Sequence, residues 1–379
     1  MAELDRPSLS APKSRPVELA AKRLRLTTPN PARSANPTTR ATSLAYLIFD
    51  RPNLELAAKF LTDFGLRVVK KTENQLYLRG TASNPFCYVV NRAPKARFVG
   101  FGLSVASVND LRKLSALHGA SAVENSDAPG GGKRVRLVDP AGFRVDAVAG
   151  QAPSEPLPHR SPIKLNSPDE IVRIDKTQRP PPLPPEIVKL GHVLLEVPNY
   201  QAVSGWYTQH FGFIPSDICV LPDGSPAATF FRLDLGDAPA DHHTLAMTMH
   251  FQAGFGHCAF EVVDADAVGM GQRVLQNRGW RHSWGVGRHI LGSQIFDYWE
   301  DPFAAKHEHY CDGDVFTSKC PTEIHAVSRE AMAQWGPPMP KSFTKPDFGL
   351  KSLVSLARNL YSVEDLTFKK LITLIKLVG

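Results

Sequence analysis

The stretches LAYLIFDRPNLELAAKFLTDFGL, residues 44–66, and LGHVLLEVPNYQAVSGWYTQHFGF, residues 190–213, share one pattern, and this pattern decides the fold. Each begins with an apolar run, turns at Pro-Asn, continues with apolar residues at helical spacing and ends at Phe-Gly. The pattern predicts a strand, a turn and a helix in both places. Matching segments of this length indicate an internal repeat, which constrains the architecture more than any single motif does.

The likeness continues along both copies. LSVASVNDL, residues 103–111, matches FEVVDADAV, residues 260–268, and each predicts a strand that runs into a helix. DPAGFRVD, residues 139–146, matches DPFAAKHE, residues 301–308, and each predicts a turn followed by a strand. Each copy therefore has the order strand, helix, strands twice over. This order predicts an α+β protein of two tandem domains, each made of paired βαβββ modules that form an open barrel-like sheet.

Composition divides the rest of the chain. Residues 1–40 hold six prolines and eight Lys or Arg against three Asp or Glu, so we expect a disordered, basic, Pro-rich tail. Ten prolines in residues 151–187 predict an extended linker between the domains, which span residues 41–150 and 188–315. Residues 316–379 are expected to form a loop-rich extension and a C-terminal helix.

Charge and cysteine usage narrow the classes of function. The formal charge of the chain is +7, but +5 of it lies in the first 40 residues, so the folded body is nearly neutral and a nucleic-acid partner is not expected. No apolar run approaches the ~18 residues of a membrane span. The five cysteines are odd in number and include no CxxC motif, which favours reduced thiols and a cytoplasmic location.

The two copies differ at three points where ligand-type residues replace others. A lone histidine in a strand is usually a packed one, but three ligand types at matching points of a repeat favour a metal site. Two imidazoles and one carboxylate on three strands of a concave sheet can form a 2-His-1-carboxylate facial triad. Such a triad leaves about three coordination positions open and is typical of non-heme Fe(II) oxygenases. The matched pairs are Tyr46 and His192, Gly100 and His257, and Asp146 and Glu308.

Glu308 also closes a longer motif, which consists of Gly287-Arg288-His289, then Tyr298 and Asp301-Pro302. With it, residues 41–315 resemble the type I extradiol ring-cleavage dioxygenases of the vicinal oxygen chelate superfamily. The chain looks most like members assigned to trihydroxytoluene-type substrates. Three positions depart from the family pattern. Asp297 replaces an apolar residue, Ala304 replaces Gly or Pro, and Gly292 replaces an Asp that is frequent there.

The resemblance implies a fold of two vicinal-oxygen-chelate domains, the first without metal, and a site in the second. Its metal would be Fe²⁺, with Mn²⁺ as a possible substitute, because the same ligands accept both. Its substrates would be a small aromatic diol and O2, and a homo-oligomer is common among relatives. The implied metal ligands are His192, His257 and Glu308, and the implied catalytic residues are His243, Tyr298 and His289. His243, which lies in DHHTLAM, residues 241–247, would be the acid/base. The neighbouring His242 either orients His243 or has only a packing role.

Two alternatives stay open. One is another metalloenzyme of the same superfamily, a glyoxalase-like isomerase or an epimerase, which also uses His and Glu ligands. Two fused copies, of which one lacks the ligands, favour the dioxygenase over this alternative. The other is a non-catalytic binding protein of this fold. The presence of all three ligand types together with His243 and Tyr298 argues against it.

Overall fold

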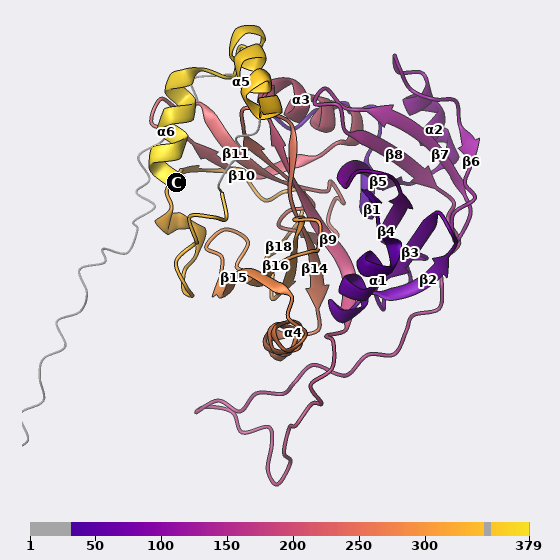
Figure 1. Ribbon diagram of the computed structural model, residues 1–379, viewed down its shortest axis with the longest axis vertical. Coiled ribbons are helices and arrows are strands. Elements are labelled where there is room, and N and C mark those ends of the chain that lie inside the picture. Colours follow the sequence, from indigo (N-terminus) through magenta and orange to yellow (C-terminus); the bar gives the residue numbers. More distant parts are fainter. Residues whose placement is uncertain (1–31, 345–349, 379) are drawn as a thin grey trace, which may run out of the picture.

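The computed structural model describes residues 32–344 and 350–378, and two large open sheets dominate it (Figure 1). The elements of the first domain are β1 (Ala41–Arg51), α1 (Leu54–Asp63), β2 (Arg67–Lys71), β3 (Gln75–Arg79), β4 (Tyr88–Arg92), β5 (Arg97–Val105), α2 (Val108–Ser115), β6 (Glu124–Asn125), β7 (Lys133–Val138) and β8 (Arg144–Ala149). Its eight strands lie in the order β2-β3-β4-β1-β5-β8-β7-β6.

The second domain repeats this plan with longer strands. Its elements are β9 (Ile187–Val197), α3 (Tyr200–Phe211), β10 (Ile214–Val220), β11 (Pro226–Arg232), β12 (Ala240–Asp241), β13 (Leu245–Met249), β14 (Gly254–Val262), α4 (Ala265–Asn277), β15 (Arg281–Arg288), β16 (Ile295–Glu300), β17 (Lys306–Cys311), β18 (Val315–Phe316) and β19 (Glu323–Ala326). The main sheet has the order β15-β16-β17-β14-β9-β13-β11-β10-β19, and β12 pairs with β18. The predicted α+β class with two open sheets is confirmed.

Both predicted strand–turn–helix segments form. In the first, the side chain of Asn53 accepts a hydrogen bond from the N–H of Leu56 and so caps the start of α1. In the second, α3 follows Asn199 and ends at Gly212, whose φ of 69° is the left-handed conformation that favours glycine at a helix end. The repeated Pro-Asn and Phe-Gly pairs therefore mark where each helix begins and ends.

The register of the three central strands is the same in both sheets. In each sheet, a residue of the first strand is paired with a small residue of the second strand, and this small residue is paired with an acidic residue of the third strand. Paired residues of neighbouring strands share a face of the sheet, so each triplet lies in one row. The sequence repeat is thus a structural repeat, confirmed residue by residue. The matched triplets are Tyr46, Gly102 and Asp146 in the first sheet, and His192, Ala259 and Glu308 in the second.

Buried polar contacts join the two domains. Nε2 of His307 lies 2.9 Å from the hydroxyl oxygen of Tyr88, and Nε2 of His309 donates to the carbonyl of Phe64 at 2.7 Å. Both histidines are fully buried, and both contact the first domain. Because they alternate with Glu308 along β17, they point away from the face that carries this carboxylate.

The expectation of disorder over residues 1–40 is wrong for residues 32–40. Arg33 and Arg40 each form an ion pair of 2.9 Å with Asp234, and backbone hydrogen bonds join this stretch to the end of α3. The basic side chains have an acidic partner on the second domain, which composition alone does not reveal. The remainder of the expected tail, residues 1–31, lies outside the described residues.

The expected linker, up to the start of β9, contains no helix or strand. The extension after β17 is more structured than expected. It adds β19 to the edge of the second sheet, and it forms two helices where one was predicted. A turn separates these helices, and the side chain of Asp365 in this turn accepts a hydrogen bond from the N–H of Gln201 at 2.7 Å. The helical elements are η1 (Glu330–Met332), α5 (Leu350–Ser362) and α6 (Phe368–Val378).

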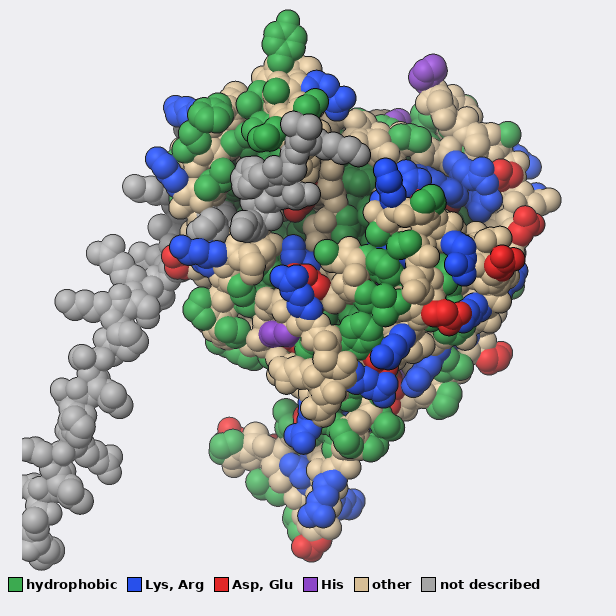
Figure 2. All heavy atoms as spheres, in the orientation of Figure 1, with side chains coloured by type: hydrophobic (Ala, Val, Ile, Leu, Met, Phe, Trp, Pro, Cys, Tyr) green, Lys and Arg blue, Asp and Glu red, His purple; other side chains and the backbone are tan. Residues whose placement is uncertain are grey.

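Two surface properties bear on the partners. Among the described residues, no helix has both the length and the apolar character needed to cross a bilayer. On the face drawn in Figure 2, Lys and Arg side chains are interspersed with Asp and Glu.

Candidate metal centre

Three neighbouring strands of the second sheet place the predicted ligands on one face. Ala259 of β14 is paired with His192 of β9 on one side and with Glu308 of β17 on the other. His257 lies two residues before Ala259 on the same strand, so its side chain projects from the same face. Ala259 is fully buried and small, which leaves space above it between the larger side chains.

The donor atoms of these three residues form a nearly equilateral triangle. Nε2 of His192 lies 3.1 Å from Nε2 of His257, and Oε2 of Glu308 lies 3.3 Å and 3.4 Å from these two atoms. Adjacent ligands of an octahedral cation with bonds of about 2.1 Å are about 3.0 Å apart. The triangle therefore fits one divalent cation bound on one face, and the opposite coordination positions stay open.

Burial and charge in the triangle also fit a cation. Glu308 is fully buried, and neither of its carboxylate oxygens accepts a well-directed hydrogen bond among the described residues. A buried carboxylate without donors is costly unless a positive charge offsets it. Burial lowers the pKa of His257 to about 3. Burial alone would raise the pKa of Glu308, but the neighbouring imidazoles outweigh this effect and lower it. Neutral imidazoles and a carboxylate are the forms that bind metal.

The three predicted catalytic residues lie around the triangle. The ring centroid of His243 is 4.0 Å from that of His192. Tyr298 of β16 is paired directly with Glu308, and its hydroxyl lies 3.0 Å from Nε2 of His289. The same His289 nitrogen lies 3.7 Å from Oε1 of Glu308. The structure therefore brings all six predicted site residues into one cluster.

Burial sets the protonation of two of these groups. It lowers the pKa of His243 well below the ordinary value, and the nearby histidines add to this effect. It raises the pKa of the Tyr298 hydroxyl well above the ordinary value, and the charge of Glu308 adds to this. At neutral pH the cluster therefore holds a neutral imidazole that can accept a proton, next to a phenol that can donate a hydrogen bond.

The equivalent place in the first domain is filled by protein atoms. The hydroxyl of Tyr46 donates to Asp146 at 2.9 Å, and the guanidinium of Arg144 donates to the same carboxylate at 2.7 and 2.8 Å. The ring of Tyr46 lies over Gly102, where a Cβ atom would come within 2.6 Å of it. The guanidinium of Arg144 thus pairs with the carboxylate that would otherwise serve as a metal ligand. This pairing supports the expectation that the first domain binds no metal.

The departures from the family pattern have local explanations. The carboxylate of Asp297 contacts Nε2 of His282 at 2.7 Å and Nε1 of Trp299 at 2.6 Å, on the side of β16 opposite Tyr298. It therefore does not line the site. Ala304 has a φ of 64°, a left-handed conformation that glycine adopts more readily than alanine.

Sequence reasoning missed two residues that contact the site indirectly. Nε2 of His242 lies 2.5 Å from Oδ2 of Asp217, and Nε2 of His325 lies 2.7 Å from Oδ1 of the same carboxylate. His242 in turn lies against His243, with 2.9 Å between their Nδ1 atoms. The orienting role left open for His242 is therefore supported. No spacing in the sequence links these positions, because the link depends on the pairing of β19 with β10.

The C-terminal extension covers part of the cluster. The ring of Phe343 lies 4.9 Å from that of Tyr298 and 5.2 Å from that of Trp284. Nδ1 of His289 lies 2.8 Å from the carbonyl oxygen of Met332, to which it donates. These contacts place apolar side chains and a backbone carbonyl next to the predicted catalytic residues.

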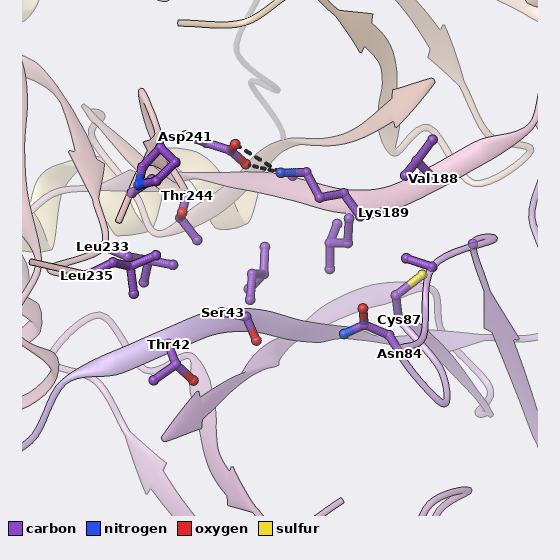
Figure 3. Close-up of a pocket in the computed structure, with 17 residues that line it drawn as sticks. Thr42, Ser43, Asn84, Cys87, Val188, Lys189, Leu233, Leu235, Asp241 and Thr244 are labelled. Atoms are coloured by element: carbon purple, nitrogen blue, oxygen red, sulfur yellow. Dashed lines mark hydrogen bonds and ion pairs between the residues drawn. The ribbon is translucent and has the colours of Figure 1, made fainter. Parts of the chain in front are cut away.

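A cavity of about 170 Å³ lies between the domains, beside this cluster (Figure 3). It separates β1 from β9, and Lys189 on its wall pairs with Asp241 at 2.7 Å. None of the three triangle residues lines it. Gly191 and Thr244, which do, are the chain neighbours of His192 and His243. The cavity is therefore adjacent to the metal centre but distinct from it.

Comparison with known proteins agrees with this geometry. The sequence model of the Glyoxalase/Bleomycin resistance protein/Dioxygenase superfamily matches residues 189–306, which include five of the six clustered residues. Residues 189–306 therefore carry the sequence pattern of this superfamily. The chain is also similar to Metapyrocatechase 2 of Cupriavidus necator, with 28% identity over 324 residues that cover 83% of this chain and 95% of that protein.

Two solved structures are similar in fold to most of this chain. The Mn(II)-bound glyoxalase from Novosphingobium aromaticivorans matches with a TM-score of 0.68 and 22% identity, over 82% of this chain and 96% of that one. Homoprotocatechuate 2,3-dioxygenase from Arthrobacter globiformis matches with a TM-score of 0.68 and 21% identity, over 84% and 96%. At these identities the likeness establishes the fold, and the two structures do not separate dioxygenase from glyoxalase.

Proposed function

We propose that this protein is an extradiol dioxygenase that opens a catechol-type or trihydroxylated aromatic ring with O2. The observation that carries the proposal is the triangle of His192, His257 and Glu308, with the buried ring of His243 beside it. The similarity to Metapyrocatechase 2 over nearly its whole length supports this reading.

The proposed metal is Fe²⁺, held by the three donors of the triangle, with Mn²⁺ as the second candidate. When bound, a ferrous ion would offer open positions to a diol and to O2, and it would lower the pKa of a coordinated hydroxyl. The buried oxygens of Glu308, which accept no well-directed hydrogen bond among the described residues, are the feature of this chain that fits such a cation.

The protein's own groups would then handle the protons. His243, neutral at working pH, accepts the proton of a substrate hydroxyl and later returns one to the ring-opened product as general acid. Tyr298 keeps its proton. Because Nδ1 of His289 donates to Met332, Nε2 of a neutral His289 accepts from the Tyr298 hydroxyl at 3.0 Å. This hydroxyl can turn to donate instead to negative charge that develops on oxygen. Phe343 and the buried Trp284 limit the access of water to this side of the site.

The glyoxalase-like alternative is retained because the fold matches a Mn(II)-bound glyoxalase with the same TM-score. Two features favour the dioxygenase. One is the similarity to Metapyrocatechase 2, and the other is His243, the proposed acid/base, which lies between β12 and β13 and so apart from the strands that carry the ligands.

One experiment separates these activities. Protein purified without oxygen is loaded with Fe²⁺ or Mn²⁺ and mixed with catechols, hydroquinones and trihydroxybenzenes, while O2 and absorbance are followed. The proposal requires one O2 consumed per ring opened, with a coloured fission product. A parallel assay with a glutathione hemithioacetal tests the glyoxalase. Turnover of the hemithioacetal without O2 uptake would replace the proposal, and tight binding of diols without any turnover would indicate a binding protein.

A further inference from the structure

A line of hydrogen-bonded side chains leads from His243 away from the metal centre. It passes from Nδ1 of His243 to Nδ1 of His242 at 2.9 Å, from Nε2 of His242 to Asp217 at 2.5 Å, and from Asp217 to Nε2 of His325 at 2.7 Å. All four residues are more than nine-tenths buried. The two ring nitrogens of His242 therefore have one partner each, and both oxygens of Asp217 are occupied.

The backbone around this line is held in place. Asp217 lies on β10, and His325 lies on β19, which pairs with β10 in parallel. The carbonyl of His242 accepts from the hydroxyl of Ser216 at 2.7 Å. Gly292 has a φ of 84°, and a Cβ atom there would come within 3.0 Å of Nδ1 of His242. A residue with a side chain at this position would crowd the imidazole, which gives a reason for glycine where relatives often have Asp.

The charge of Asp217 determines which nitrogens carry protons. Burial would raise the pKa of this carboxyl, but the hydrogen bonds from His242 and His325 outweigh it and lower the pKa to about 2. The group is therefore a carboxylate that only accepts, so Nε2 of His242 must donate to it. A neutral imidazole has one N–H, which leaves Nδ1 of His242 as an acceptor. Nδ1 of His243 must then be the donor, and Nε2 of His243 keeps its lone pair.

We propose that Asp217, held by His325, is a positioning residue that fixes the tautomer of His243 through His242. Nε2 is the ring nitrogen of His243 that lies outside this line, so its lone pair is the one available to take a substrate proton. The catalytic consequence rests on the proposed dioxygenase function, whereas the tautomer itself does not. The C-terminal extension thereby acquires a role, because β19 supplies His325.

Replacing Asp217 by Asn tests the idea, since an amide donates where the carboxylate accepts. If the amide N–H faces His242, then Nε2 of His242 must accept, its Nδ1 must donate, and His243 must carry its proton on Nε2. An imidazole with this tautomer cannot act as a base toward the site. In other enzymes, a catalytic histidine held in the wrong tautomer loses most of its activity. We therefore expect turnover to fall by about 10²- to 10⁴-fold while the metal stays bound.

The direct readout is ¹⁵N NMR of histidine-labelled protein loaded with diamagnetic Zn²⁺, with the His243 signals identified by their loss in His243→Gln. In the parent we expect the proton of His243 on Nδ1, and in Asp217→Asn on Nε2. A parent protein with the His243 proton on Nε2 overturns the proposal without any variant. So does a large loss of turnover in a folded Asp217→Asn protein whose His243 proton stays on Nδ1.

Two further variants separate positioning from simple stability. His325→Gln keeps an N–H donor toward Asp217 and should retain the parent tautomer and turnover within a few fold. Glu323→Gln, next to His325 but 69% exposed, is the matched control and should behave as the parent. Loss of turnover in His325→Gln with the parent tautomer intact would contradict the role assigned to the line. If the parent opens no aromatic ring, the proposed function fails, and the NMR result still decides the tautomer.

Discussion

Nε2 of His192 and Oε2 of Glu308 lie 3.3 Å apart, although a whole strand, β14, separates the strands that carry them. Backbones two strands apart in a sheet are about 9.6 Å from each other. The two side chains can converge because the residue between them, Ala259, has only a methyl group. A small residue at this point is thus as necessary to the candidate site as the ligands themselves.

Enlarging Ala259 should therefore remove the metal without touching a ligand. In Ala259→Leu the added atoms would occupy the space above β14, and bound metal should drop to background. Overpacking should also cost about 1–3 kcal/mol of unfolding free energy. Metal analysis and thermal unfolding check both effects. Ala259→Gly serves as the control and should keep its metal; a Leu variant that binds metal like the parent would place the cation elsewhere.

Removing a ligand should weaken metal binding more than losing a supporting hydrogen bond does. For His192→Ala, His257→Ala and Glu308→Ala, we expect a large rise in the dissociation constant for Fe²⁺. The rise should exceed the ~10–100-fold loss of affinity that is typical when a residue hydrogen-bonded to a metal ligand is replaced. The measurement is an anaerobic titration. Asp146→Asn changes the equivalent acidic residue of the first domain, which pairs with Arg144, and should leave Fe²⁺ binding as in the parent.

His243→Ala should keep the metal and lose turnover. General acid/base catalysis typically contributes about 10²- to 10⁴-fold, so kcat should fall within that range while metal content stays constant. Steady-state O2 uptake with the best diol measures this. His250→Ala alters a partly buried histidine near Glu196, away from the triangle, and should not change kcat. Parent-like turnover in His243→Ala would refute the acid/base assignment.

The metal-free protein should lose stability as the pH falls from about 6.5 to about 4. Burial lowers the pKa of both His307 and His309 to about 4. In the unfolded chain these groups titrate near 6.5, so between these values the unfolded state binds more protons and is favoured. Above pH 7 the contribution of these groups to stability is complete. Urea unfolding from pH 7.5 to 4.5 measures the slope, which should decrease by about one proton in His309→Gln. An unchanged slope in that variant would contradict the assignment.

Much of the fold could be predicted because the repeat leaves local marks. Pro-Asn and Phe-Gly fix the ends of α1 and α3, and the alternation along the strands fixes which residues share a face. The six site residues followed from comparison of the two copies and from the family motif. The register that the repeat implies brings the three ligands together, whereas His243 and His289 lie outside the strands and were assigned from the family motif.

The remainder depends on contacts between segments that are distant in sequence. The pairing of Arg33 and Arg40 with Asp234 orders a stretch that composition predicts to be disordered. Asp217 and His325 are 108 residues apart and meet only because β19 joins the edge of the sheet. Nothing local in either segment indicates that partner.

Anomalous X-ray scattering at the iron edge, from crystals loaded anaerobically with Fe²⁺, tests the candidate metal centre most directly. We expect one peak in each protein chain, within about 2.0–2.3 Å of Nε2 of His192, Nε2 of His257 and a carboxylate oxygen of Glu308. A peak bound by other residues, or no peak in a fully loaded crystal, would contradict it.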